Sequence, residues 1–208
     1  MDTLSNQSFS LRPHDTFGAW LSDVQRHFES AEQFLTELED VHRQIVSEYP
    51  LPLGEYLSNA DEDYPELWVL SRKRDRLSDA VQIFTAMAAE GFLNYYGVVR
   101  IGEKEFNVHF ERLNVTQKLL MLLLFCDAIS LSDKHPIMTV LTKIAQARNL
   151  QVHPKTKEFN LSEERPSKPI PGAAREAVVS MYTFFKLFLE LVPKAEHLVP
   201  PKARTKKY

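Results

Sequence analysis

Five polar residues lie within ten positions near the end of a helix-like stretch: Arg148, Asn149, His153, Lys155 and Lys157. An arginine binds phosphate through a planar fork of N–H donors, and a histidine exchanges a proton near neutral pH. Asn149 and His153 are four residues apart, so on a continuous helix the amide could hold the imidazole in one orientation. The cluster therefore has the composition of a phosphate site.

The proline after His153 bears on how the arginine and the histidine can meet. On an ideal helix, residues five apart point about 140° away from each other. Pro154 disfavours the helical conformation for the residue before it, so we expect His153 at or just past the helix end, where it can turn toward Arg148. The alternative is purely structural, because arginine and histidine in a last turn also interact with the helix dipole and the free carbonyl groups.

The elements that position this cluster are predicted to be helices, because apolar residues recur at three- and four-residue steps. One stripe runs from Phe17 to Ile45 and should end before Pro50. A second helix should begin near Pro65 and end at Gly97 or soon after. Its residues Ile83, Met87, Glu90 and Asn94 share a second face, so this helix should be central or should face a partner.

Three further helices complete the predicted bundle. Asn114 and Gln117 resemble a capping box, so a third helix should run from Val115 to about Leu131. That segment is apolar nearly all round, which is typical of a helix in the middle of a bundle. A fourth helix should begin at Pro136, and a fifth should carry the apolar residues between positions 174 and 188.

The predicted organisation is a single all-α domain of about five main helices over residues 15–195. Residues 1–14 are polar and are expected to be disordered. Residues 196–208 form a basic C-terminal tail, of which the stretch "PPKARTKKY" from Pro200 is expected to be disordered. The chain has 208 residues, 25 basic against 28 acidic, so any contact with nucleic acid must be local. A single cysteine and the absence of a signal peptide or a long apolar run favour a cytoplasmic protein that does not cross a membrane.

Other chemistry finds little support in the sequence. The histidines are scattered and no carboxylates stand at ligand spacing, so we expect neither a metal nor a cofactor. Cys126 lies in the most apolar segment and is expected to be a buried thiol. Asp127 and Asp133 are interpreted as solvated carboxylates near a helix end.

The segment "RNLQVH", Arg148 to His153, resembles the signature of the HEPN family (higher eukaryotes and prokaryotes nucleotide-binding domains). The preceding "EGFLNYYG" and "ERLNVTQKLLML" are similar to the family's earlier elements, and the resemblance covers about Asp75 to Leu191. Membership implies a helical bundle that forms a homodimer, with two copies of the motif facing each other across a cleft. Many members are metal-independent endoribonucleases of toxin–antitoxin or phage-defence systems, and others are inactive scaffolds.

The resemblance implies roles for the polar residues. His153 would exchange a proton with the 2′-hydroxyl or the leaving oxygen of RNA, Arg148 would bind the phosphate, and Asn149 would orient one of them. Lys155 and Lys157 would contact RNA. Glu90 and Asn94 would either support the site or form an ordinary surface pair one helical turn apart. An antitoxin or another regulatory protein is an expected partner. The alternative function is a non-catalytic module that binds RNA, a nucleotide or a partner protein.

Overall fold

The structure, a computed structural model, describes residues 15–49, 64–152 and 171–205. Every regular element in these ranges is helical, so the all-α class is confirmed. The elements are α1 Asp15–Glu48, α3 Pro65–Ile101, α4 Glu103–His109, α5 Val115–Asp127, α6 Pro136–Val152, α7 Gly172–Leu191, the 3-10 helix η1 Pro193–Leu198, and α8 Pro201–Thr205.

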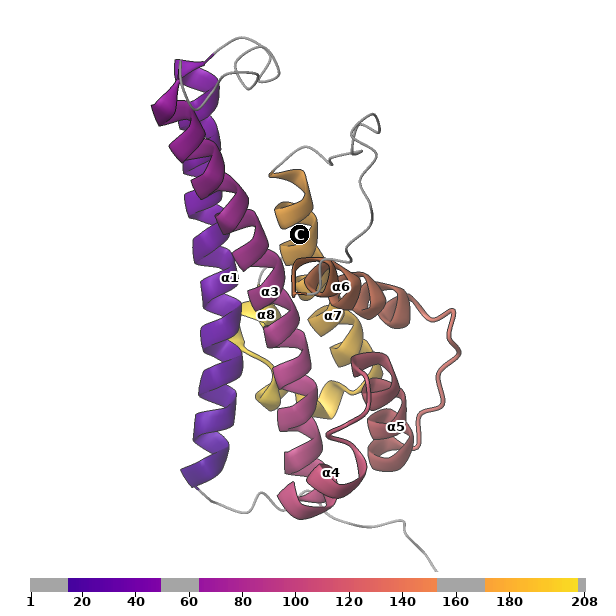
Figure 1. The fold of residues 1–208 in the computed structure, drawn as a ribbon. Helices are drawn as coiled ribbons and strands as arrows, with labels where there is room; N and C mark the ends of the chain where they lie inside the picture. The colour runs from indigo at the N-terminus through magenta and orange to yellow at the C-terminus, as the bar shows by residue number, and fades with distance from the viewer. Residues whose placement is uncertain (1–14, 50–63, 153–170, 206–208) are drawn as a thin grey trace, which may run out of the picture.

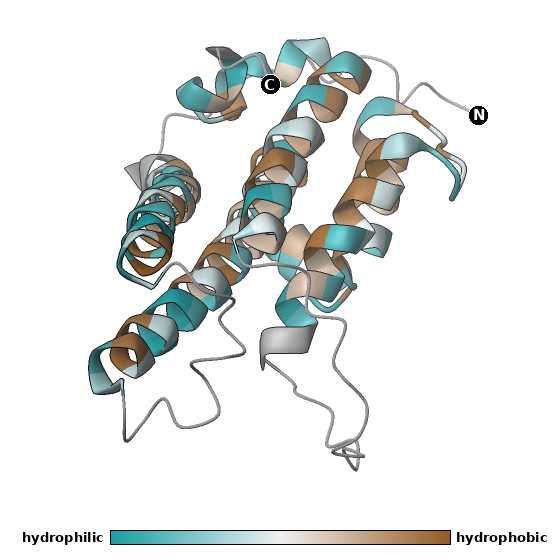
Figure 2. Ribbon diagram, turned by 90° about the horizontal axis from the view of Figure 1, so that it is seen from above, coloured by the Kyte–Doolittle hydropathy of each residue, from teal (hydrophilic) through white to brown (hydrophobic). Residues whose placement is uncertain are grey.

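Helices α1 and α3 form a long antiparallel pair, with α6 on the other side of α3 (Figure 1). The α1 stripe predicted from the sequence is confirmed from Leu21 to Ile45, where its residues are buried or partly buried, and the side chains of Phe17 and Trp20 lie outside those described. The ring of Phe84 on α3 lies 5.4 Å from Phe34 and 5.8 Å from His27 on α1, between ring centroids. Hydropathy colouring shows that the long helices carry both polar and apolar residues, as amphipathic packing requires (Figure 2).

Helix α3 is the centre of the bundle, which is one of the two alternatives that its second face left open. It contacts α1, α4, α5, α6 and α7. Toward α7 it presents Phe92, whose ring centroid lies 5.2 Å from that of Phe185 and 4.8 Å from that of Phe188, both in edge-on geometry. Such edge-to-face contacts add to the burial of apolar area, so this aromatic cluster fixes α7 against α3.

Helix α5 differs from its prediction in two respects. The capping box of Asn114 and Gln117 is confirmed, but the helix ends at Asp127, where Ala128 adopts a left-handed conformation with φ 56°. It also lies at the edge of the bundle, because Leu124 and Phe125 are 50% and 65% exposed. An apolar sequence therefore did not mean a central helix, and α5 buries one side against α3 and leaves a second apolar side open.

The C-terminal segment is the other correction. Residues 200–205 were expected to be disordered, but they contain the short helix α8, and residues 196–198 of the tail form the end of η1. Val199 and Ala203 are buried, and the guanidinium of Arg204 donates to the carbonyl oxygen of Val199 from Nη2 at 2.7 Å. The basic composition of this segment does not predict the burial of its apolar residues. Residues 1–14 and 206–208 lie outside the described ranges.

Two glycines of α3 differ in what surrounds them, and this yields a prediction about packing. A Cβ at Gly97 would overlap the ring of Phe106 on α4, whereas a Cβ at Gly91 would meet Val24 at an ordinary 3.5 Å. We expect Gly97→Ala to lower the free energy of unfolding by about 1–3 kcal/mol through overpacking. Gly91→Ala, the matched control, should raise it by about 0.5–1 kcal/mol because alanine is the better helix former.

Urea unfolding followed by circular dichroism measures both changes. If Gly97→Ala were as stable as Gly91→Ala, the close approach of α4 to α3 at this position would be contradicted.

Candidate functional site

Arg148 and Asn149 lie near the end of α6, which is described through Val152. Arg148 is half-buried and Asn149 is exposed. Within the described ranges, Arg148 makes no ion pair or hydrogen bond, although the chain has more acidic than basic residues. A half-buried guanidinium without a carboxylate partner retains its full capacity to bind an anion.

The other residues of the predicted cluster are not part of the described chain. His153, Lys155 and Lys157 lie outside the described residues, so the meeting of the arginine and the histidine stays a prediction. The structure brings Arg148 and Asn149 to the same helix end, one residue apart, which on an ideal helix separates their directions by about 100°.

Glu90 and Asn94 belong to a different cluster. Their shared partner is Lys118 of α5, whose Nζ lies 2.6 Å from Oδ1 of Asn94 and 3.9 Å from Oε1 of Glu90. No hydrogen bond or ion pair in the described ranges joins either residue to Arg148. These two residues therefore hold a buried lysine between α3 and α5, which neither of the two sequence-based interpretations anticipated.

Lys118 is the most deeply buried ionisable side chain of this cluster. Its side chain is 1% exposed, and its Nζ lies 5.7 Å from the ring centroid of Phe106. Burial lowers the pKa of the Lys118 ammonium, and the nearby carboxylates of Glu90 and Glu111 act in the opposite direction. The burial of Lys118 between α3 and α5 was not predicted from the sequence, because a single lysine in an apolar helix is usually expected to reach solvent along its flexible stem.

A second polar cluster joins the C-terminal ends of α3 and α5. Arg100 Nη1 lies 2.7 Å from Oδ1 of Asp127 and 2.7 Å from the hydroxyl oxygen of Tyr96, to which it donates. The Tyr96 hydroxyl donates to Asp127 Oδ2, and Arg100 Nη2 donates to the carbonyl oxygen of Cys126. The Asp127 side chain is 2% exposed, so its interpretation as a solvated helix-end carboxylate is wrong.

The pKa shifts in this second cluster favour a structural role. Burial, the largest single effect, lowers the pKa of the Arg100 guanidinium, but the hydrogen bond to Asp127 and the charge interactions with Tyr96, Asp127 and Cys126 together raise it. Burial and the hydrogen bond to Asp127 raise the pKa of Tyr96. Burial raises the pKa of the Cys126 thiol to about 11, which leaves it protonated at neutral pH and a poor nucleophile. The expectation of a buried, unreactive thiol is consistent with this environment.

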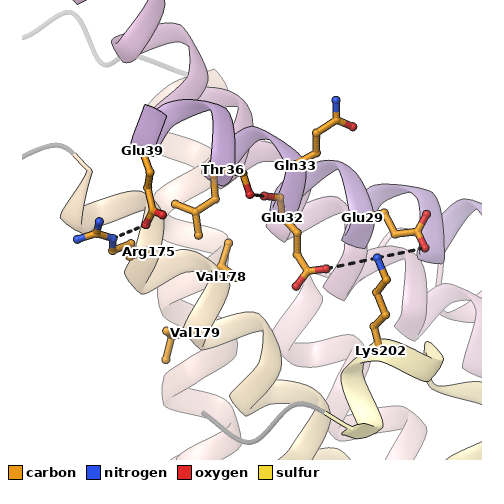
Figure 3. A pocket seen from close by; sticks show the side chains of 10 residues that line it. Glu29, Glu32, Gln33, Thr36, Glu39, Arg175, Val178, Val179 and Lys202 are labelled. Atoms are coloured by element: carbon orange, nitrogen blue, oxygen red, sulfur yellow. Dashed lines mark hydrogen bonds and ion pairs between the residues drawn. The ribbon is translucent and has the colours of Figure 1, made fainter. Parts of the chain in front are cut away.

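A groove of about 790 Å³ lies between α1, α7 and α8 (Figure 3). Its α1 wall carries Glu29, Glu32 and Glu39. Arg175 Nε lies 2.5 Å from Glu39 Oε1, and Lys202 Nζ lies 3.8 Å from a carboxylate oxygen of each of the other two glutamates. Because these carboxylates already have cationic partners and carry negative charge, the groove is a poor site for a phosphate.

The described part of the chain contains neither a group of side chains suited to a metal ion nor a membrane-spanning helix. No group of three or more histidine, cysteine or carboxylate side chains there is arranged to hold a metal ion. None of the described helices is both long and apolar enough to span a bilayer.

Comparisons of the chain with protein-family models, curated proteins and solved structures find no match. The case for a function therefore depends on the chemistry of the side chains and on the motif around Arg148.

The Arg100–Asp127 pair predicts unequal effects of two aspartate substitutions. Asp127→Ala leaves Arg100 without its buried carboxylate partner, so we expect the free energy of unfolding to fall by about 3 kcal/mol. This loss is at the lower end for a broken buried ion pair, because the Arg100 side chain is 13% exposed and can contact some water in the variant. Asp133→Ala, at an exposed position nearby, should change stability by less than about 0.5 kcal/mol.

Chemical denaturation measures both variants. The double variant Arg100→Met with Asp127→Ala should recover part of the loss, since it removes the uncompensated charge. Equal stability of Asp127→Ala and Asp133→Ala would contradict the assignment of this pair as a structural link.

Proposed function

We propose that the protein is a metal-independent endoribonuclease of HEPN type that acts as a homodimer. The observation that carries the proposal is the position of Arg148, a half-buried arginine without a carboxylate partner among the described residues, near the end of α6. The exposed Asn149 follows it, and His153 follows Val152, the last described residue of that helix. A toxin–antitoxin or phage-defence setting is part of the same proposal.

The proposed reaction uses the nucleophile that RNA itself carries. A base removes the proton of the 2′-hydroxyl, the 2′-oxygen forms a bond to the adjacent phosphorus, and the bond from phosphorus to the 5′-oxygen breaks. The 5′-oxygen takes up a proton and leaves as a hydroxyl, and the other fragment ends in a 2′,3′-cyclic phosphate. His153 acts as the base or as the acid, and its unperturbed pKa near neutrality suits either role.

Arg148 binds the phosphate in the proposed site and takes no part in proton transfer. Negative charge on the phosphate oxygens grows as the 2′-oxygen attacks, and a guanidinium beside those oxygens stabilises that charge. Its fork of donors can bind two phosphate oxygens at once, which an ammonium group does less well. One helix end supplies few basic groups, so two copies of the motif across a twofold axis would double the positive charge around one phosphate.

The decisive experiment follows cleavage of a labelled single-stranded RNA in excess chelator. Wild-type protein should cut it, leave 2′,3′-cyclic phosphate ends, and change in rate between about pH 5 and 8, where an unperturbed imidazole changes charge. His153→Ala should slow cleavage about 10²- to 10⁴-fold, and Arg148→Lys about 10²-fold without moving the pH profile. His109→Ala, at an exposed position on α4, is the matched control and should cut normally.

Three results would contradict the proposal: fragments with 5′-phosphate ends, activity that requires added magnesium, or full activity of Arg148→Lys. RNA binding with no cleavage under any of these conditions would instead favour the non-catalytic binding module.

The shared cleft makes a separate prediction. Mixing equal amounts of Arg148→Ala and His153→Ala chains should restore cleavage, because roughly half of the dimers then hold one intact arginine and one intact histidine in the same cleft. Each inactive variant mixed with itself is the control. Native mass spectrometry identifies the mixed dimers, and mixed dimers without any recovered activity would show that the cleft is not shared. A wild-type protein that is monomeric at micromolar concentration would exclude the homodimer.

A further inference from the structure

The first turns of α3 carry an exposed tryptophan with an arginine over its ring. Trp68 is 43% exposed, and the guanidinium carbon of Arg72, one helical turn later, lies 5.1 Å from its ring centroid. An exposed indole presents a flat surface on which a base can stack, and an arginine at its face contributes a cation–π contact. Neither residue belongs to the motif around Arg148 or to the two buried clusters.

Three exposed cations follow this tryptophan along α3. Arg72, Lys73 and Arg76 are exposed, and within the described ranges none of them forms an ion pair. The nearby carboxylate of Asp75 forms an ion pair with Arg74, in which Nη2 of Arg74 lies 3.0 Å from Oδ1 of Asp75. The side chain of Arg74 is 12% exposed. The local carboxylate therefore does not neutralise the three exposed side chains.

Glu66 and Asp79 are the other described carboxylates on this part of α3. Burial, and then the neighbouring charge of Asp75, raise the pKa of Asp79. In the described ranges no ion pair joins either carboxylate to Arg72 or Arg76.

Helical geometry places Trp68, Arg72 and Arg76 in one row. They are four residues apart, so they spread over about 80° of the helix surface and step by about 6 Å along its axis. Arg72 and Glu90 are separated by 18 residues, or five full turns, and Glu90 faces Lys118 of α5. The row therefore continues the α5 side of α3, about 100–120° around the helix from Phe84 and Gly91, which face α1.

We propose that Trp68, Arg72 and Arg76 form a binding surface for single-stranded RNA, in which a base stacks on the indole and the two arginines contact phosphates. The inference depends on the proposed function in that RNA is the substrate. It adds a second contact outside the cleavage motif. Single-stranded nucleic acid fits because its base faces are free to stack, whereas the bases of a duplex are stacked on one another.

The test uses a fluorescent 12-nucleotide 2′-O-methyl RNA, which lacks the 2′-hydroxyl and stays intact during the measurement. Binding to the full chain is followed by anisotropy at several salt concentrations. Trp68→Ala should weaken binding about 5- to 150-fold, the usual effect of losing one stacked base, and Trp68→Phe should retain part of the affinity. Arg72→Gln with Arg76→Gln should reduce the slope of log affinity against log salt by about 1.4, or about 0.7 for each lost phosphate contact.

Two variants control for side-chain size and charge. Val69→Ala shortens an exposed apolar residue beside Trp68, and Arg26→Gln removes an exposed positive charge from α1. Both should leave affinity within about twofold. A duplex of the same sequence and length should bind more weakly than the single strand.

The outcomes separate this surface from the cleavage site. Wild-type binding that Trp68→Ala and the double arginine variant leave unchanged would overturn the RNA surface and leave the proposed cleavage intact. Loss of binding in those variants, together with a wild type that never cuts RNA, would support the surface and refute the nuclease. A wild type that does not bind the single strand would overturn both, and would leave the exposed tryptophan as a surface for a protein partner.

Discussion

Two buried cations link α3 to α5, and the path of the chain to the proposed site depends on that link. Lys118 reaches from α5 to Asn94 and Glu90, and Arg100 reaches from α3 to Asp127. Each cation enters the interface only because an oxygen of the other helix lies within hydrogen-bonding distance, since an unpaired buried charge would be far more costly. The pairing therefore constrains the position of α5 along α3 as well as its distance from it.

This constraint extends to the helix that carries Arg148. The chain leaves α5 immediately after Asp127, and α6 begins at Pro136, so the position of Asp127 sets where the connection starts. Helix α6 then contacts α3, α5 and α7. Burial of Leu141 and Ile144 leaves Arg148 and Asn149 on the later, less buried turns. An arginine there can meet an anion without breaking any contact that holds the bundle together.

The helices could be predicted from the sequence because their signals are local. Proline at the first turn, the capping box before Val115 and the apolar periodicity of α1 each depend on residues within one or two turns.

The role of Asp127 could not be predicted, because Arg100 lies 27 positions earlier and nothing in the local pattern distinguishes a paired carboxylate from a solvated one. The roles of Glu90 and Asn94 could not be predicted for the same reason, because their partner Lys118 belongs to another helix. The exposure of Phe125 was missed because hydropathy reports what a side chain favours, whereas exposure depends on which neighbours reach it.

The distribution of paired and unpaired charges favours α3 and α6 over α1 for contact with RNA. On α1, the glutamates of the groove have partners in Arg175 and Lys202, so that wall offers an anion negative charge and occupied cations. On α3 and α6, the cations of the RNA surface and Arg148 lack carboxylate partners within the described ranges. A chain with a net charge of −3 attracts a polyanion only where such cations are gathered and the acidic residues are engaged elsewhere. Phosphate contacts are additive and salt-dependent, so the exposed arginines of α3 suit a substrate that must be held and then released, whereas Arg148 is proposed to stabilise the charge that grows on the cleaved phosphate.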